Sequence, residues 1–242
     1  MKLDDFICAY RDDFAFAFDN RIILNWYPRR IVERSHPGMR VLELGIGHGY
    51  TCQRFSEHFE SYTVIDASAA IIGRFREQYP GSRANLVEAY FEEFDTDERF
   101  DAIVMGFVLE HVDDPAAILR QYRRFLAPSG RCFVAVPNAE SLHRRFGQAA
   151  GFLDDLFALG EGDLALGHQR LYSVASLTVE MEASGYRVVS REGIFLKPLT
   201  TGQLTSLNLS PEILEGMCRV GVEYPELSAA LLFEAVSADQ TP

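Results

Sequence analysis

Three glycines at alternate positions follow a short apolar run in the stretch VLELGIGHGY, residues 41–50. Gly45, Gly47 and Gly49 supply backbone that can adopt unusual angles, and they leave no side chain where a ligand must touch the chain. Asp66 ends the next β-rich run, and a carboxylate at that place can accept hydrogen bonds from both hydroxyls of a ribose. These residues predict a site for a ligand that carries an intact ribose diol.

The glycine spacing differs from the fingerprint of dinucleotide-binding proteins. In that fingerprint the third glycine falls three residues after the second, whereas here Gly49 follows Gly47 by two and Tyr50 comes next. The chain also lacks a Tyr-x-x-x-Lys dyad. A nicotinamide-dependent oxidoreductase is therefore an alternative that the spacing disfavours.

The elements that must position these residues alternate along the chain. Helical patterns with apolar residues three and four apart separate β-rich runs, which predicts a parallel sheet with helices on both faces. One such helix, 115–127, is expected to stop at the turn Pro128-Ser129-Gly130. The last two strands could pair as an antiparallel hairpin that spans a long connection. The predicted strands are 40–44, 61–66, 84–89, 100–106, 131–137, 187–195 and 226–237.

Two regions lie outside this alternation of strands and helices. We therefore expect an N-terminal lid (1–39) and a core (40–242) that carries a cap insertion (138–172). In the lid, Phe6, Tyr10, Phe14 and Phe18 share one helical face, which either docks a helix on the core or covers a ligand. The insertion would lie over the carboxyl ends of the strands, where open α/β sheets bind ligands.

Composition limits the partners. The 242 residues are 48% hydrophobic and carry a net charge of −12, so we expect a globular protein that does not bind nucleic acid. No signal peptide or membrane-spanning run is evident, which predicts a cytoplasmic protein without a membrane partner. The four cysteines lack metal-ligand spacing, and we predict no metal site. Both a monomer and a homodimer are compatible with the sequence.

Several motifs in order resemble those of class I S-adenosylmethionine-dependent methyltransferases, in particular the small-molecule subgroup that includes quinone-biosynthesis enzymes. The motifs are VLELGIGHG, VIDAS, FDAIVMGFVLEHVDDP, FLAPSG and VAVPN, and together they cover residues 40–137. The resemblance implies a doubly wound, seven-stranded Rossmann-like sheet whose last strand is antiparallel. It also implies S-adenosylmethionine as cofactor and S-adenosylhomocysteine as product.

The resemblance assigns cofactor contacts to residues at the strand ends. Glu43 would help to hold the cationic amino group, with the glycine loop beside the methionine half of the cofactor, and Asp66 would bind the ribose. Tyr90 and Phe91 would edge the adenine, although the family often has Asp at this place. The implied cofactor-binding residues are Glu43, Gly45, Gly47, Gly49, Asp66, Ala67, Tyr90, Phe91, Gly106 and Phe107.

His111, in LEHVDDP, is the predicted catalytic residue. Methyl transfer is an in-line displacement in which the acceptor must lose a proton, and an imidazole can act as the general base, typically for roughly 10²–10⁴ in rate. The alternative is a structural role beside Asp113, Asp114 and Pro115, which are typical of a helix start.

Acceptor contacts are expected from the lid and the insertion. GHQRLYS resembles a Gly-His-x-Arg-x-Tyr stretch of some relatives, whose alternative role is a buried anchor for the insertion. Lys197, next to Pro198, could reach an acidic substrate, but an exposed lysine is the commoner case. The predicted substrate-binding residues are Tyr10, Phe14, Phe18, Asn138, His168, Arg170 and Tyr172.

The sequence therefore predicts transfer of a methyl group to an O or N atom of a small molecule, in a biosynthetic pathway. Two alternatives remain: a methyltransferase that acts on a protein or peptide, and a non-catalytic protein that binds S-adenosylmethionine. An aromatic cap favours the small acceptor.

Overall fold

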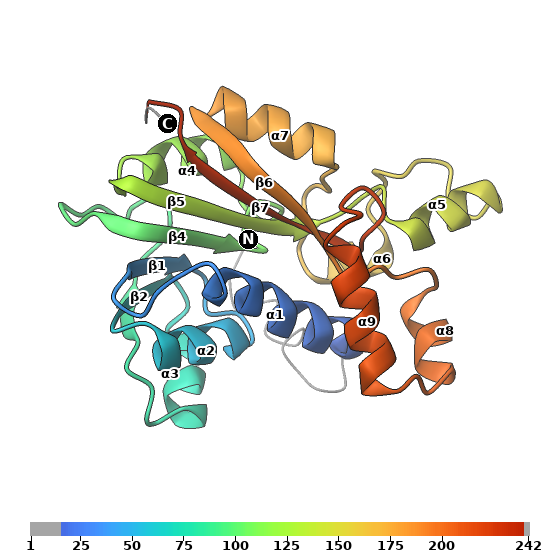
Figure 1. Cartoon of the computed structure of the whole chain (residues 1–242), viewed down its shortest axis with the longest axis horizontal. Helices are drawn as coiled ribbons and strands as arrows, with labels where there is room; N and C mark the ends of the chain where they lie inside the picture. The colour runs from blue at the N-terminus through green and yellow to red at the C-terminus, as the bar shows by residue number, and fades with distance from the viewer. Residues whose placement is uncertain (1–15, 240–242) are drawn as a thin grey trace.

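The computed structural model describes residues 16–239, and a seven-stranded sheet runs through them in the order β3-β2-β1-β4-β5-β7-β6 (Figure 1). Strands β1 to β5 are parallel, and β7 is antiparallel to both of its neighbours. This confirms the predicted fold class. The strands are β1 (Arg40–Leu44), β2 (Ser61–Asp66), β3 (Asn85–Glu88), β4 (Phe100–Gly106), β5 (Leu126–Pro137), β6 (Tyr186–Ile194) and β7 (Ala230–Ser237).

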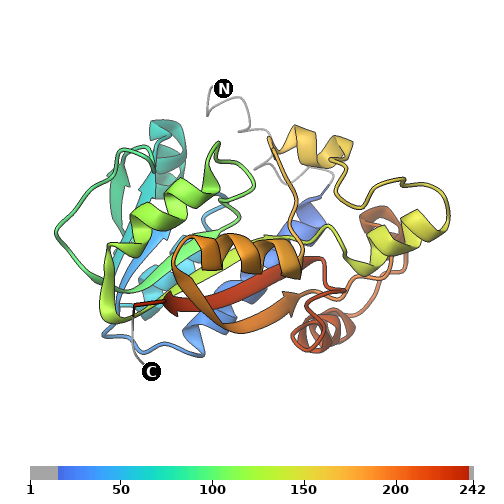
Figure 2. The ribbon, with the colours of Figure 1, turned by 90° about the horizontal axis from the view of Figure 1, so that it is seen from above.

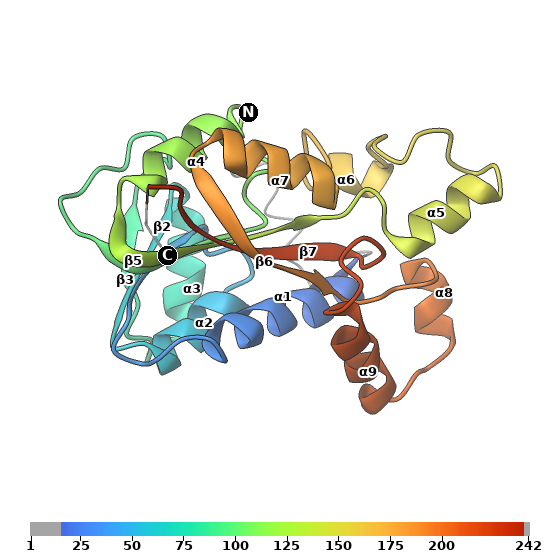
Figure 3. The same cartoon turned by 45° about the horizontal axis from the view of Figure 1, so that its top comes forward.

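Helices cover both faces of the sheet. Viewed from above, the green α4 (Pro115–Arg123) and the orange α7 (Val174–Ala183) lie over the sheet, with the blue α1 (Ala17–Val32) beneath it (Figure 2). Helices α2 (Tyr50–His58) and α3 (Ala69–Gln78) lie on the same side as α1 (Figure 3). Among residues 16–239, no helix is both long and apolar enough to cross a membrane.

The alternation of side chains along β1 divides the core into two layers. Leu42 and Leu44 pack in the layer under α4 and α7, whereas Val41 packs in the layer that contains residues of α1 and α2. Because successive strand residues point to opposite faces, Glu43 lies on the α1 side. A carboxylate is thereby buried beneath the N-terminal helix.

The insertion after β5 and the connection after β6 form a separate group of short helices. Helices α5 (Leu142–Ala149), α6 (Glu161–Ala165) and α8 (Thr201–Ser206) lie at the end of the molecule toward which β5 points (Figure 1). Helices α8 and α9 (Pro211–Gly221) occupy the connection between β6 and β7, for which the sequence predicted only a long connection.

The boundary between α4 and β5 also differs from the prediction. Helix α4 ends at Arg123, and β5 begins at Leu126, so the predicted turn at residues 128–130 lies within the strand as a register shift. Gly130 makes this packing feasible, because a Cβ there would lie 2.7 Å from the carbonyl oxygen of Phe100.

Candidate active site

A cavity of about 1010 Å³ lies at the carboxyl ends of the parallel strands. Its walls come from α1, the glycine loop, the ends of β2 and β4, and the insertion. This is where open α/β sheets bind ligands. The predicted cofactor residues all line it, so the fold brings together the set implied by the motifs.

The glycine loop forms the floor of the cavity. Gly45, Gly47 and Gly49 have φ angles of 81°, 54° and 82°, which residues with a Cβ rarely adopt. A Cβ at Gly45 would make an ordinary contact, 3.8 Å from the ring tip of Phe91. The loop therefore requires glycine for its backbone shape.

Asp66 is held rigidly at the edge of this loop. Its Oδ2 accepts a hydrogen bond from the amide of Ile46 at 2.9 Å, and its Oδ1 accepts one from the amide of Ser68 at 2.9 Å. A carboxylate oxygen can accept more than one hydrogen bond, so both oxygens can also bind ligand hydroxyls. Ala67 lies beside it in the cavity wall.

Glu43 is buried at the deep end of the cavity. It accepts a hydrogen bond from the hydroxyl of Tyr62, and its burial raises the pKa of the carboxyl group to about 8. The neighbouring cation Arg40 contacts Asp101 at 3.6 Å and forms no ion pair with Glu43 among the described residues. A cation placed next to Glu43 would favour the ionised carboxylate and would be held by it.

Tyr90 and Phe91 flank the mouth of the cavity on the β3 side. Tyr90 is exposed, whereas Phe91 is half-buried against the glycine loop. The carbonyl oxygen of Phe91 accepts a hydrogen bond from Tyr122 at 3.0 Å, which fixes this segment on α4. Tyr90 and Phe91 are therefore positioned to contact a flat ring bound above the glycine loop.

Gly106 and Phe107 pass close to α1. Phe107 has a left-handed φ of 59°, which is rare for a bulky residue, and its ring meets that of Tyr27 edge to face at 5.7 Å. Any side chain at Gly106 would overlap Tyr27, whose hydroxyl hydrogen-bonds to Thr51 at 2.9 Å. Tyr27 is thus a cavity residue that the sequence prediction missed.

The cavity face of α1 is not the predicted aromatic face. Phe18 packs into the core, while the residues that line the cavity are Phe16, Asp19, Asn20, Ile23, Leu24 and Tyr27. These residues are three and four positions apart, so their shared helical face could have been found in the sequence. The aromatic repeat ends at Phe18, one position before Asp19, and therefore marks a different face of the helix. Tyr10 and Phe14 lie outside the described residues.

His111 reaches the cavity from the loop after β4. Burial, assisted by the nearby His168, lowers its pKa to about 4, so the imidazole is neutral near pH 7. The rings of His111 and His168 lie 4.9 Å apart. The Gln169 amide holds this loop by donating to the carbonyl oxygen of His111 at 2.6 Å.

The segment GHQRLY places only part of its polar set in the cavity. His168 lines it, but Arg170 donates to the carbonyl oxygens of Leu109, at 2.9 Å, and of Val112. Tyr172 is buried, and its hydroxyl points to the same Leu109 carbonyl at 3.5 Å. Neither Arg170 nor Tyr172 lines the cavity, which corrects the expectation of acceptor contacts and fits the alternative role of an anchor.

Asn138 lines the cavity, but its side chain is already used. Its amide donates to three carbonyl oxygens, those of Pro225, Glu226 and Ser228, and its Oδ1 accepts from the amide of Glu140 at 2.9 Å. This leaves Asn138 as the link between the insertion and the start of β7.

Lys197 is buried rather than exposed. Its ammonium group forms an ion pair with Asp19 of α1 and donates a hydrogen bond to Thr201 at 2.8 Å. His143 lies close enough for Lys197 to help burial lower the His143 pKa to about 3. Asp19, His143 and Lys197 all line the cavity, and they form a polar end that sequence spacing could not reveal because they come from three distant segments.

A family model described as a methyltransferase domain matches residues 19–191, which is more than half of the chain. The chain belongs to this methyltransferase family. The match confirms the predicted class, S-adenosylmethionine-dependent methyltransferases, and the catalytic nature of the domain.

Curated relatives of this methyltransferase domain include ubiquinone biosynthesis O-methyltransferases. The protein from Aeromonas salmonicida (strain A449) is 26% identical over 188 residues, covering 75% of this chain and 76% of the relative. The protein from Rhodopseudomonas palustris (strain BisB5) is 32% identical over 105 residues, covering 42% and 41%. The chain spans about half the length of the matched Pseudomonas relatives, 52% in two of them.

Solved structures share the fold of the methyltransferase domain. The N-methyltransferase NodS from Bradyrhizobium japonicum WM9, in complex with S-adenosylhomocysteine, has a TM-score of 0.61 at 15% identity, with 98% of each chain covered. The Burkholderia thailandensis 1,6-didemethyltoxoflavin-N1-methyltransferase has a TM-score of 0.60 at 18% identity, covering 98% of this chain and 87% of that one.

Proposed function

We propose that the cavity binds S-adenosylmethionine and transfers its methyl group to an O or N atom of a small-molecule acceptor. The observation that carries the proposal is the pairing of a left-handed glycine loop with a fixed Asp66 carboxylate on the floor of one cavity. The cofactor's ribose would bind Asp66, its cationic amino group would approach Glu43, and its adenine would lie near Tyr90 and Phe91. Gly106 and Phe107 would lie beneath the sulfonium.

The shape of the remaining cavity supports a small acceptor. Helix α1 and the insertion both line the cavity at the carboxyl ends of the strands, so they bound the space beyond the cofactor. The polar end formed by Asp19, His143 and Lys197 offers groups that could orient a small polar molecule. The relatives named for ubiquinone biosynthesis favour a biosynthetic role.

The reaction would be an in-line displacement. A lone pair of the acceptor O or N atom forms a bond to the methyl carbon while the carbon–sulfur bond breaks, and its electron pair stays on sulfur to give S-adenosylhomocysteine. His111 would accept the proton that the acceptor loses, and its neutral imidazole in the cavity wall supports this role.

The test is label transfer from S-adenosylmethionine that carries a radioactive methyl group. The purified protein is incubated with panels of small phenols and amines, and separately with mixed peptides, and the labelled product is separated by mass. We expect label in the small-molecule fraction. Label only in peptides would establish the protein-methylating alternative, and S-adenosylhomocysteine binding without transfer to either panel would count against phenols, amines and peptides as acceptors.

A further inference from the structure

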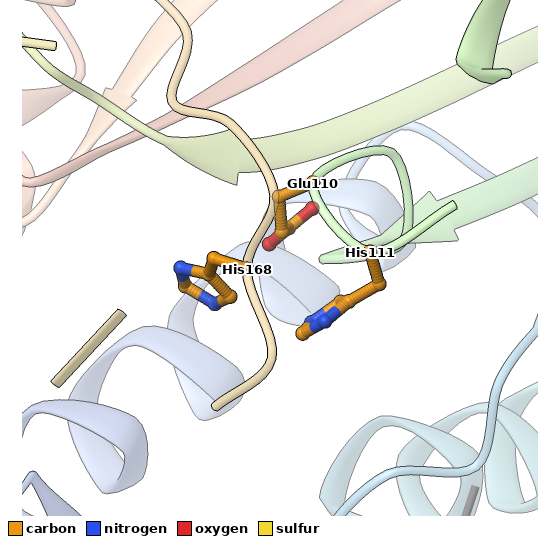
Figure 4. Close-up of side chains that lie close together, drawn as sticks. All are labelled: Glu110, His111 and His168. Carbon is orange, nitrogen blue, oxygen red and sulfur yellow. The ribbon is translucent and has the colours of Figure 1, made fainter. Parts of the chain in front are cut away.

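Three metal-ligating side chains converge at the wall of the cavity. Glu110 and His111 extend from the loop after β4, and His168 extends from the insertion toward the same point (Figure 4). Within the described residues, one possible ligand atom from each of them lies within 4.8 Å of the others. We propose that Glu110, His111 and His168 bind a divalent transition-metal ion, in contrast to the sequence expectation of no metal site.

The strongest support is the state of the Glu110 side chain. Glu110 is fully buried, yet neither of its carboxylate oxygens has a hydrogen-bond partner among the described residues. A buried polar group without a partner is costly, and a buried carboxylate without one is more so. A cation between Glu110 and the two imidazoles would remove this cost.

A hydrogen bond to Asp163 orients His168 as a metal ligand would need to be oriented. Asp163 accepts a hydrogen bond from Nδ1 of His168 at 3.2 Å, which directs Nε2 away from Asp163. Asp163 is itself fixed by the amide of Gly160 at 2.8 Å and lies 3.8 Å from Arg144. Such carboxylate–histidine pairs orient imidazole ligands at metal sites.

Among residues 16–239, Arg170 is a cation near Glu110 that could replace the metal, and its contacts argue against this. It is near enough to affect Glu110 electrostatically, but its hydrogen bonds go to the carbonyl oxygens of Leu109, Val112 and Asp113. It therefore fixes the loop that carries Glu110 and His111 and leaves the carboxylate oxygens unbound.

Two imidazoles and one carboxylate select a particular class of ion. Nitrogen ligands suit Zn²⁺, Fe²⁺ or Co²⁺ better than Mg²⁺ or Ca²⁺, which prefer oxygen. Because metal–nitrogen bonds are about 2.0–2.1 Å long, ligand atoms on one tetrahedral ion lie about 3.3–3.4 Å apart, so the three side chains must move closer together. Three protein ligands leave coordination positions open, and His111 and His168 both line the cavity.

The open positions connect the metal to the acceptor, a step that rests on the proposed function. An acceptor hydroxyl bound to the ion would have a lowered pKa and release its proton to water. Its oxygen would then attack the methyl carbon as the carbon–sulfur bond breaks, and S-adenosylhomocysteine would leave. With the ion bound, His111 would act as a ligand that positions the ion and no longer as the base, and the acceptor class would be hydroxyl compounds.

Metal binding can be measured without any turnover. The full-length protein is stripped with a chelator, and Co²⁺ or Zn²⁺ is titrated by calorimetry, with the visible absorption of Co²⁺ as a second readout. We expect one ion per chain, at least 100-fold weaker binding in Glu110→Gln and His168→Ala, and 10- to 100-fold weaker binding in Asp163→Asn. His143→Ala, which removes another histidine of the same cavity, should bind the ion as the wild type does.

The outcomes separate this inference from the proposed function. Each variant is also titrated with S-adenosylhomocysteine, so an unfolded variant is recognised by loss of both ligands. No stoichiometric metal binding by the folded wild-type protein, or equal binding by Glu110→Gln and His168→Ala, would overturn the metal site. Methyl transfer by the metal-free protein at the full rate would overturn the activating role alone, and failure to bind S-adenosylhomocysteine would count against the proposed function instead.

Discussion

At the scale of single residues, Asp66 is the position where sequence and geometry agree most directly. Both of its oxygens already accept backbone amides of the loop, and the proposed ribose hydroxyls would add two further hydrogen bonds to a charged acceptor. We expect Asp66→Ala to weaken S-adenosylhomocysteine binding by roughly 2–4 kcal/mol. Calorimetry of the folded variant measures this, and Asp101→Ala, which removes a carboxylate outside the cavity, should bind normally.

The buried carboxyl group of Glu43 predicts how the free energy of unfolding depends on pH. Its pKa is raised by burial from 4.5 to about 8, so between these values the folded protein binds the proton and the unfolded chain does not. Stability therefore falls as pH rises through that window, and this contribution should disappear in Glu43→Gln. Urea unfolding of both proteins from pH 5 to pH 8 gives the difference. A difference in unfolding free energy that stays constant with pH would show that Glu43 titrates normally.

At the scale of elements, a buried ion pair joins the start of α1 to the connection after β6. Asp19 and Lys197 are both buried, so removing the carboxylate leaves an unpaired buried ammonium group. We expect Asp19→Ala to lower the free energy of unfolding by about 3–5 kcal/mol. The double variant Asp19→Ala/Lys197→Met should recover much of this loss, and urea unfolding of the two single and the double variants completes the cycle.

The segment 167–172 acts on the loop after β4 rather than on the acceptor. Arg170 binds the carbonyl oxygens of Leu109 and Val112, so Arg170→Ala should displace His111 and lower kcat by on the order of 10²-fold. Affinity for S-adenosylhomocysteine should change little, because the glycine loop is untouched. Arg145→Ala, which removes a bond to Glu140 within the insertion, serves as the matched control. A rise in the acceptor KM with normal kcat would restore Arg170 to the acceptor site.

Features built from neighbouring residues could be predicted from the sequence, whereas contacts between distant segments could not. The strands, the glycine loop and Asp66 lie close together in sequence and follow local backbone rules, so their places could be predicted. The Asp19–Lys197 pair and the cluster of Glu110 with His168 join segments far apart, and no local periodicity encodes such pairs. The face of α1 was misassigned because Phe18 continues an aromatic repeat yet packs into the core.

At the scale of the whole molecule, removing the residues before Phe16 tests whether the N-terminal segment acts as a lid. Phe6, Tyr10 and Phe14 share a predicted helical face, and they lie outside the segment of the glycine loop. We expect a chain that lacks residues 1–15 to fold and bind S-adenosylhomocysteine, but to transfer methyl groups to its acceptor at least 10-fold more slowly. Thermal unfolding confirms the fold of the truncated chain. An unchanged rate would mean that the aromatic face only packs.

The order of strands at the β6 edge has a consequence for synthesis on the ribosome. β7 lies between β5 and β6, so β6 leaves the ribosome before the strand that attaches it to the sheet exists. Until residues 230–237 emerge, the parallel half of the sheet ends at an open β5 edge, and β6 has no strand to pair with. Completion of the sheet must therefore wait until residues 230–237 have emerged, and a nascent chain stalled before residue 230 would present the unpaired edges of β5 and β6 to chaperones.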